Sequence, residues 1–101
     1  MSEFIKVAEK SDIPVGQGRP FDIQDRCVAI FNCDGEFYAI DNICPHRQGS
    51  LGEGALFGDV VSCPFHGWEF NVKTGNCEMI PGESVERFDL KVEGEYLLVK
   101  L

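Results

Sequence analysis

The segments Cys44-Pro45-His46 and Cys63-Pro64-Phe65-His66 carry residue types that bind transition metals, and residues 47–62 lie between them. Each segment offers one thiol and one imidazole in a stretch too short to bury a core of its own. Both His residues of the chain fall in these segments. Because each segment places a Cys first and a His shortly after it, the two loops can converge on one metal centre.

A mixed Cys2His2 set has two interpretations. It suits a tetrahedral structural zinc ion, but zinc modules usually place Cys with Cys at one knuckle and His with His at the other. The order C-x-H…C-x2-H instead resembles the Rieske [2Fe–2S] motif, in which two Cys hold one iron and two His hold the other. The flanking residues His46-Arg47-Gln48-Gly49 and His66-Gly67-Trp68 match that family as well. The resemblance runs over nearly the whole chain.

The resemblance implies one [2Fe–2S] cluster as the cofactor, with the ligands Cys44, His46, Cys63 and His66. In the family the Cys-bound iron lies inside and the His-bound iron lies near the surface, so the two His residues are the expected exit route of the electron. The residues expected around the cluster are Arg47, Gly49, Phe65, Trp68, Phe70 and Pro81, the last of them in a third loop that covers the cluster in the family.

Four positions depart from the high-potential, respiratory members of the family. Gly49 and Phe65 stand where those proteins have two Cys joined as a disulfide. Trp68 and Phe70 stand where they have a Ser and a Tyr whose hydroxyls donate hydrogen bonds to cluster sulfurs. Fewer donors stabilise the reduced cluster less. We therefore expect a low reduction potential, around −150 mV.

The pattern of apolar and turn residues predicts an all-β chain. Apolar runs indicate strands at residues 4–7, 19–23, 27–31, 36–40, 59–62, 68–72, 85–92 and 96–99, with 27–31 as a central strand. Asp34-Gly35 predicts a hairpin turn, and no window shows the period and caps of a helix. With the resemblance, this indicates a Rieske-type antiparallel β-sandwich with an inserted cluster-binding lobe at roughly residues 41–83. We expect a single domain, 1–101.

Two turn features lie beside the first ligand segment. Asp41 and Asn42 can hydrogen-bond their own backbone, which suits a turn into the loop. After His46 the chain is Gly-rich, with Gly49, Gly52, Gly54 and Gly58. These glycines allow close backbone approach to a cluster, whereas for Gly52 and Gly54 plain flexibility is an equal alternative.

The charge and the remaining Cys residues limit the function further. The net charge of −8, from 9 basic and 17 acidic residues, disfavours nucleic acid and anionic membranes and suits brief docking on basic partners. Cys27, Cys33 and Cys77 are an odd number, which argues against a secreted disulfide framework. We expect them to be small apolar residues on strands.

The first residues lack the apolar run of a signal peptide, and no stretch approaches the roughly 20 apolar residues that span a bilayer. The cytoplasm is the expected location.

Two functions fit these observations. The first is a soluble ferredoxin, by default a monomer, that carries single electrons from a reductase to a terminal oxygenase and docks near His46 and His66. The second is a small Rieske-like subunit of an assimilatory nitrite reductase. Many such subunits lack the ligands, whereas this chain has all four, which favours the carrier. A Rieske oxygenase would need a second iron held by two further His residues and a carboxylate. Both His residues of this chain already belong to the cluster motif, so no His remains for a second iron. The chain is therefore expected to be an electron-transfer component and not an enzyme.

Overall fold

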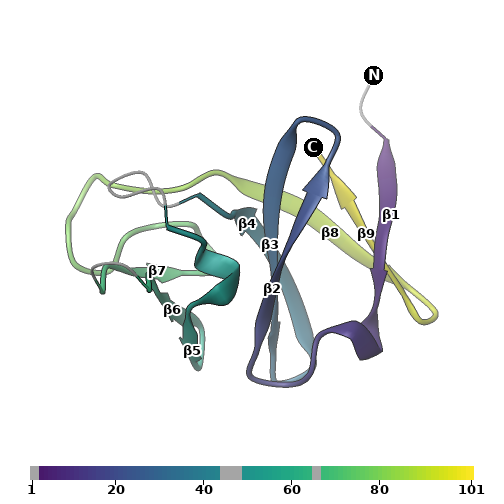
Figure 1. The fold of residues 1–101 in the computed structure, drawn as a ribbon, viewed down its shortest axis with the longest axis horizontal. Helices are drawn as coiled ribbons and strands as arrows, with labels where there is room; N and C mark the ends of the chain where they lie inside the picture. The colour runs from purple at the N-terminus through teal and green to yellow at the C-terminus, as the bar shows by residue number, and fades with distance from the viewer. Residues whose placement is uncertain (1–2, 44–48, 65–66) are drawn as a thin grey trace.

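The computed structural model describes residues 3–43, 49–64 and 67–101. Within these ranges all strand pairs are antiparallel, and no α-helix is present. The elements in chain order are β1 Phe4–Glu9, η1 Lys10–Asp12, β2 Gly18–Ile23, β3 Arg26–Cys33, β4 Glu36–Asp41, η2 Leu51–Glu53, β5 Ala55–Phe57, β6 Val60–Ser62, β7 Glu69–Asn71, β8 Arg87–Glu93 and β9 Tyr96–Lys100, where η marks a short 3-10 helix (Figure 1). The all-β fold class is thereby confirmed.

The strands form two sheets. The larger has the order β1-β9-β8-β4-β3-β2, and the smaller has the order β5-β6-β7. Buried residues from β1, β2, β3, β8 and β9 share one core, so the larger sheet folds over itself as a sandwich. The smaller sheet lies to one side of it (Figure 1). In the chain it falls between β4 and β8, inside the segment expected to form an inserted lobe.

Strand β3 is buried on both faces. Ile30 belongs to the core inside the larger sheet, whereas its neighbour Phe31 belongs to a second core that packs against the smaller sheet. The partner strand β4 divides in the same way between Ala39 and Ile40. Burial on both faces explains why 27–31 is apolar without alternation. As expected, the strand is an inner one, paired with β2 and β4.

The β3–β4 hairpin turns at Asp34 and Gly35, as the sequence predicts. Their φ angles are 56° and 94°, the left-handed values that a two-residue hairpin turn needs at both positions. The turn therefore fixes the register that carries β4 toward the first ligand segment.

The sequence patterns indicated no strand between residues 49 and 58, and the structure differs there. This stretch contains η2 and the short strand β5, whose three residues pair with β6. Three-residue elements are too short to show a hydrophobic period. Strand β5 forms by pairing with β6, and the local sequence does not reveal this pairing.

Candidate metal centre

The structure describes some of the expected site residues and not others. Of the four expected ligands, only Cys63 lies within the described residues; Cys44, His46 and His66 lie outside them, as do Arg47 and Phe65. Gly49, Trp68, Phe70 and Pro81 are described. The ligand set as a whole therefore stays a prediction.

Cys63 lies at the base of a closed hairpin between β6 and β7. Its backbone N–H donates to the carbonyl of Trp68 at 2.7 Å, and the N–H of Gly67 donates to the carbonyl of Cys63 at 3.0 Å. Gly67 adopts a φ of +79°, which favours glycine. The Cys63 side chain is 2% exposed, and its thiol forms no disulfide. A buried, unpaired thiol in a hydrogen-bonded hairpin fits a ligand of an inner iron.

The rings of Trp68 and Phe70 lie directly after this hairpin. Their centroids are 6.5 Å apart and the rings are tilted by 41°. Phe70 is fully buried, pairs with Val61 across β6 and β7, and shares its core with Cys63. Neither ring carries a hydroxyl, so neither side chain can supply the O–H donor of the high-potential pattern.

Pro81 belongs to a turn beside the same hairpin. The N–H of Glu83 donates to the carbonyl of Ile80 at 3.2 Å, and Gly82 has a φ of +92°. The segment before this turn is tied to β7, because the N–H of Glu78 donates to the carbonyl of Glu69 at 2.7 Å. Ile80 packs on the same core as Trp68 and Cys63. Pro81 itself is exposed.

Asn42 precedes the first ligand segment and bonds residues that follow it in the chain. Its Oδ1 accepts the N–H of Gly52 at 2.6 Å, and its Nδ2 donates to Ser50 Oγ at 2.9 Å. Ile43 and Ser50 form an isolated β-bridge just inside this contact. The sequence suggested only that Asn42 bonds its own neighbouring backbone. Its side-chain partners lie eight and ten positions further on, beyond the range of local turn patterns.

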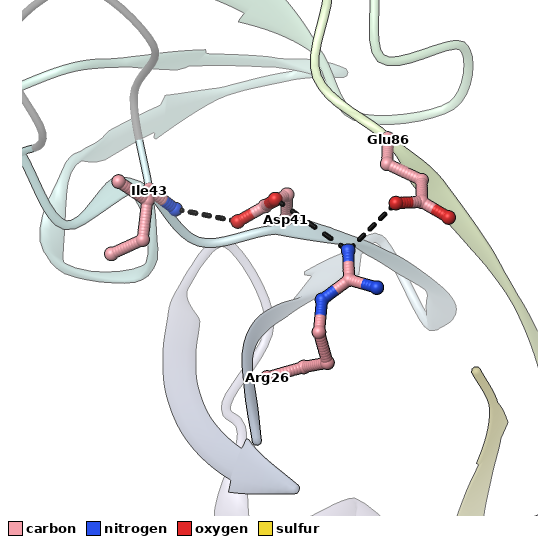
Figure 2. Close-up of polar contacts among 4 residues, drawn as sticks. All are labelled: Arg26, Asp41, Ile43 and Glu86. Carbon is pink, nitrogen blue, oxygen red and sulfur yellow. Dashed lines mark hydrogen bonds and ion pairs between the residues drawn. The ribbon is translucent and has the colours of Figure 1, made fainter. Parts of the chain in front are cut away.

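Asp41 fulfils the expectation for a local turn. Its Oδ1 accepts the N–H of Ile43 at 3.0 Å (Figure 2). Its Oδ2 lies 3.8 Å from Nη2 of Arg26, whose same nitrogen lies 2.6 Å from Oε1 of Glu86. The backbone N–H of Asp41 also donates to the carbonyl of Glu86 at 2.8 Å. Arg26 thus joins the two chain segments that flank the smaller sheet, a role that the sequence did not indicate.

Gly52 and Gly54 have a packing role that differs from both interpretations drawn from the sequence. A Cβ at Gly52 would lie 2.6 Å from the backbone nitrogen of Pro20, and a Cβ at Gly54 would overlap the carbonyl oxygen of Ser62. Both positions therefore require glycine because backbone passes too close for any side chain. The close approach is to the protein's own chain, and flexibility is not the reason.

The three remaining Cys residues are free thiols on or near strands. Cys33 and Cys77 are buried and Cys27 is half-buried. Burial raises the pKa of the Cys33 thiol to about 11 and raises the pKa of the Cys27 thiol as well. The raised pKa keeps the Cys27 and Cys33 thiols neutral at pH 7, which fits the expected role as small apolar residues.

Residues 3–92 match the family model of the Rieske [2Fe-2S] domain. This chain belongs to the Rieske family. The Rieske protein is 38% identical to the biphenyl dioxygenase ferredoxin subunit of Pseudomonas sp. (strain KKS102), over 95% of this chain and 90% of that one. A solved complex of reduced oxygenase and oxidized ferredoxin in carbazole 1,9a-dioxygenase contains a chain that is 35% identical, with a TM-score of 0.87, over 95% of this chain and 91% of that one.

A third match shows the fold alone. A chain assigned to an NADH-dependent nitrite reductase small subunit from Mycobacterium tuberculosis has a TM-score of 0.90 but 21% identity, over 100% of this chain and 96% of that one. Relatives of higher identity include a dioxygenase ferredoxin subunit at 38% and the ferredoxin component of an alkene monooxygenase system, from Xanthobacter autotrophicus, at 36%. The Rieske protein is therefore an electron-transfer component with one [2Fe–2S] cluster, and it is not itself the catalyst. In the described part of the chain, no helix is both long and apolar enough to cross a membrane.

Proposed function

We propose that this Rieske protein carries single electrons from a reductase to a terminal oxygenase. The observation that supports this proposal most directly is the 38% identity to a dioxygenase ferredoxin subunit, which extends over 90% of that subunit. The electron-transfer step needs no substrate pocket in this chain. It needs a cluster held near the surface and a partner that can approach it.

The proposed ligands are Cys44 and Cys63 for the inner iron and His46 and His66 for the outer iron. When bound, the cluster supplies a one-electron acceptor and donor. The 2% exposure of Cys63 supports the inner position, because a buried thiolate gains most from a neighbouring cation. Residues 41–83 would form the lobe that holds the cluster, within a single domain of residues 1–101.

The proposed reduction potential is low, around −150 mV. The support lies in Trp68 and Phe70, which face the core beside Cys63 without any hydroxyl. A sulfur that accepts fewer hydrogen bonds holds the extra negative charge of the reduced state less well. The prediction concerns the cluster of the intact protein and is checked by a potentiometric titration.

The proposed partners dock transiently near His46 and His66. With a net charge of −8, the protein favours basic partner surfaces and should associate faster at low salt. We propose no nucleic-acid or membrane partner, a monomer, and a cytoplasmic location. Reversing the charge at Arg47, beside His46, should slow reduction or onward transfer. Unchanged rates in both half-reactions would exclude Arg47 from the docking surface.

The alternative function is a small subunit of a nitrite reductase. Its support is the shared fold, and the complete ligand pattern of this chain favours the carrier. Stable co-purification with a large reductase subunit would favour the alternative. Reduction by a ferredoxin reductase, followed by electron delivery to an oxygenase, would favour the carrier.

The test of the cluster itself is EPR spectroscopy of the purified protein, as isolated and after dithionite, with metal analysis of the same sample. A rhombic signal of low average g that develops on reduction, with about two irons per chain, is the expected result. A colourless, EPR-silent protein with one zinc would overturn the proposal.

A further inference from the structure

The Asn42 side chain is buried and fully hydrogen-bonded. It is 3% exposed, and one of only two buried polar residues in the described part of the chain. Besides its contacts to Gly52 and Ser50, its Nδ2 lies 3.3 Å from Cys27 Sγ. The backbone N–H of Gly52 can only donate, so Oδ1 must face Gly52 and Nδ2 must face the sulfur. The orientation of the amide is therefore determined by its partners.

These contacts join three parts of the molecule. The backbone of Asn42 donates to the carbonyl of Cys27 at 3.0 Å and accepts the N–H of Leu51 at 2.8 Å. The side chain spans from Ser50 and Gly52, on the far side of the first ligand loop, to Cys27 at the start of β3. One residue thus ties residues 50–52, which follow the first ligand segment in the chain, to the start of β3.

We propose that Asn42 is the positioning residue of the first ligand loop, and that its amide sets the reduction potential of the cluster and the rate at which the cluster is lost. Asn42 acts through its contacts to Ser50 and Gly52, which follow the first ligand segment in the chain. The inference rests on the proposed assignment of Cys44 and His46 as ligands. Groups that orient metal ligands from outside typically change metal affinity by about 10–100-fold when they are removed.

The chain offers a matched control in Asn32. This second buried Asn is 5% exposed, its Nδ2 donates to the carbonyl of Ile13 at 2.8 Å, and its Oδ1 accepts the N–H of Gly35 at 2.8 Å. It therefore has the same chemistry and burial as Asn42. It lies five residues beyond Cys27 on β3, roughly 17 Å along an extended strand. Loss of its side chain should destabilise the sandwich without reaching the ligand loop.

The experiment compares Asn42→Ala, Ser50→Ala and Asn32→Ala in the cluster-loaded protein by EPR, redox titration and the rate of cluster loss at 25 °C. We expect Asn42→Ala to shift the potential, to alter the g values and to speed cluster loss about tenfold or more. Ser50→Ala removes a single partner of the amide and should change all three in the same direction by less. Asn32→Ala should keep the potential and g values of the unaltered protein.

Several results would overturn the inference. One is an unchanged potential and spectrum in both Asn42→Ala and Ser50→Ala, and another is an equal change in Asn32→Ala. If Asn42→Ala does not accumulate as folded protein, Ser50→Ala decides alone, because it leaves the Asn42–Gly52 contact in place. A failed ligand assignment is distinguishable, because the unaltered protein itself would then lack the two irons and the Rieske EPR signal.

Discussion

The guanidinium of Arg26 lies 2.6 Å from the carboxylate of Glu86, a contact between residues 60 positions apart in the sequence (Figure 2). Glu86 directly precedes β8, and the second partner of Arg26, Asp41, ends β4. The smaller sheet lies between these two points in the chain. Arg26 therefore links the end of β4 to the start of β8 through two ion pairs. These are the two points between which the smaller sheet lies in the sequence.

Arg26→Gln should remove both ion pairs and weaken the link between β4 and β8. The ion pairs are partly exposed, and the guanidinium also lies 5.0 Å from the ring centroid of Phe88, so we expect a loss of about 1 kcal/mol in unfolding free energy. In a domain of this size that lowers the apparent Tm by about 4–8 °C. Because Asp41 also holds the N–H of Ile43, cluster loss should become faster as well, which visible absorbance measures.

Lys91→Gln is the control for Arg26. Lys91 pairs with Glu93 at 3.1 Å and lies 4.6 Å from the ring centroid of Phe4, so it combines the same two kinds of contact away from the ligand segments. It should reduce stability by a comparable amount and leave the rate of cluster loss nearly unchanged. Equal acceleration of cluster loss in both variants would contradict a specific role for Arg26.

Phe70→Tyr should raise the reduction potential if the new hydroxyl reaches a ligand sulfur. Phe70 is fully buried in the core that contains Cys63. A hydroxyl buried there without a hydrogen bond would cost free energy, so it should bond an acceptor within reach. A hydrogen bond that is about 1 kcal/mol stronger to the reduced state corresponds to roughly 45 mV for a one-electron couple. Potentiometric EPR titration measures the shift. Phe88→Tyr, in the other core, is the control and should leave the potential unchanged; no shift in a Phe70→Tyr protein with a normal cluster would refute the account.

Much of the fold could be predicted from the sequence because its signals are local. The apolar run 27–31, the Asp34-Gly35 turn and the alternation around Phe70 each reflect the burial of one strand and its immediate neighbours. The pattern C-x-H…C-x2-H, formed by Cys44, His46, Cys63 and His66, predicted the family that the family model confirms, because such a pattern is local in the sequence.

The contacts that hold the site together could not be predicted in this way. Asn42 bonds residues eight and ten positions away, and Arg26 bonds a residue 60 positions away. Such pairs depend on the register of strands that only the complete fold determines. Strand β5 could not be predicted for the same reason, since its three residues form a strand by pairing with β6.

Gly54→Ala should destabilise the smaller sheet by steric overlap. A Cβ at this position would meet the carbonyl oxygen of Ser62 in β6, and backbone cannot move aside without disturbing the β5–β6 pairing. We expect a loss of about 2–3 kcal/mol, measured as a lower apparent Tm. Gly58→Ala is the comparison, because Gly58 has a φ of +62° but no atom within 4 Å of the place where a Cβ would lie, so strain alone should cost about 1–2 kcal/mol. A smaller effect at Gly54 than at Gly58 would show that close approach does not decide this position.

Cys33 should be alkylated with an unusual dependence on pH. Its side chain is 8% exposed, and burial, which disfavours the charged thiolate, raises its pKa from the ordinary value of 9.0 to about 11. Only the thiolate reacts. The labelling rate at Cys33 should therefore climb about tenfold per pH unit from pH 8 upward and level off only near pH 11, whereas an ordinary thiol levels off near pH 9.

Iodoacetamide labelling followed by peptide mass spectrometry measures this rate at Cys33 alone. Urea-unfolded protein is the control, and there the rate at Cys33 should level off near pH 9 because the burial is lost. In the folded protein at pH 8, the half-buried Cys27 should react before Cys33. A folded-state rate at Cys33 that levels off near pH 9 would mean that the thiol is hydrated, and that β3 is not closed against the smaller sheet at its end.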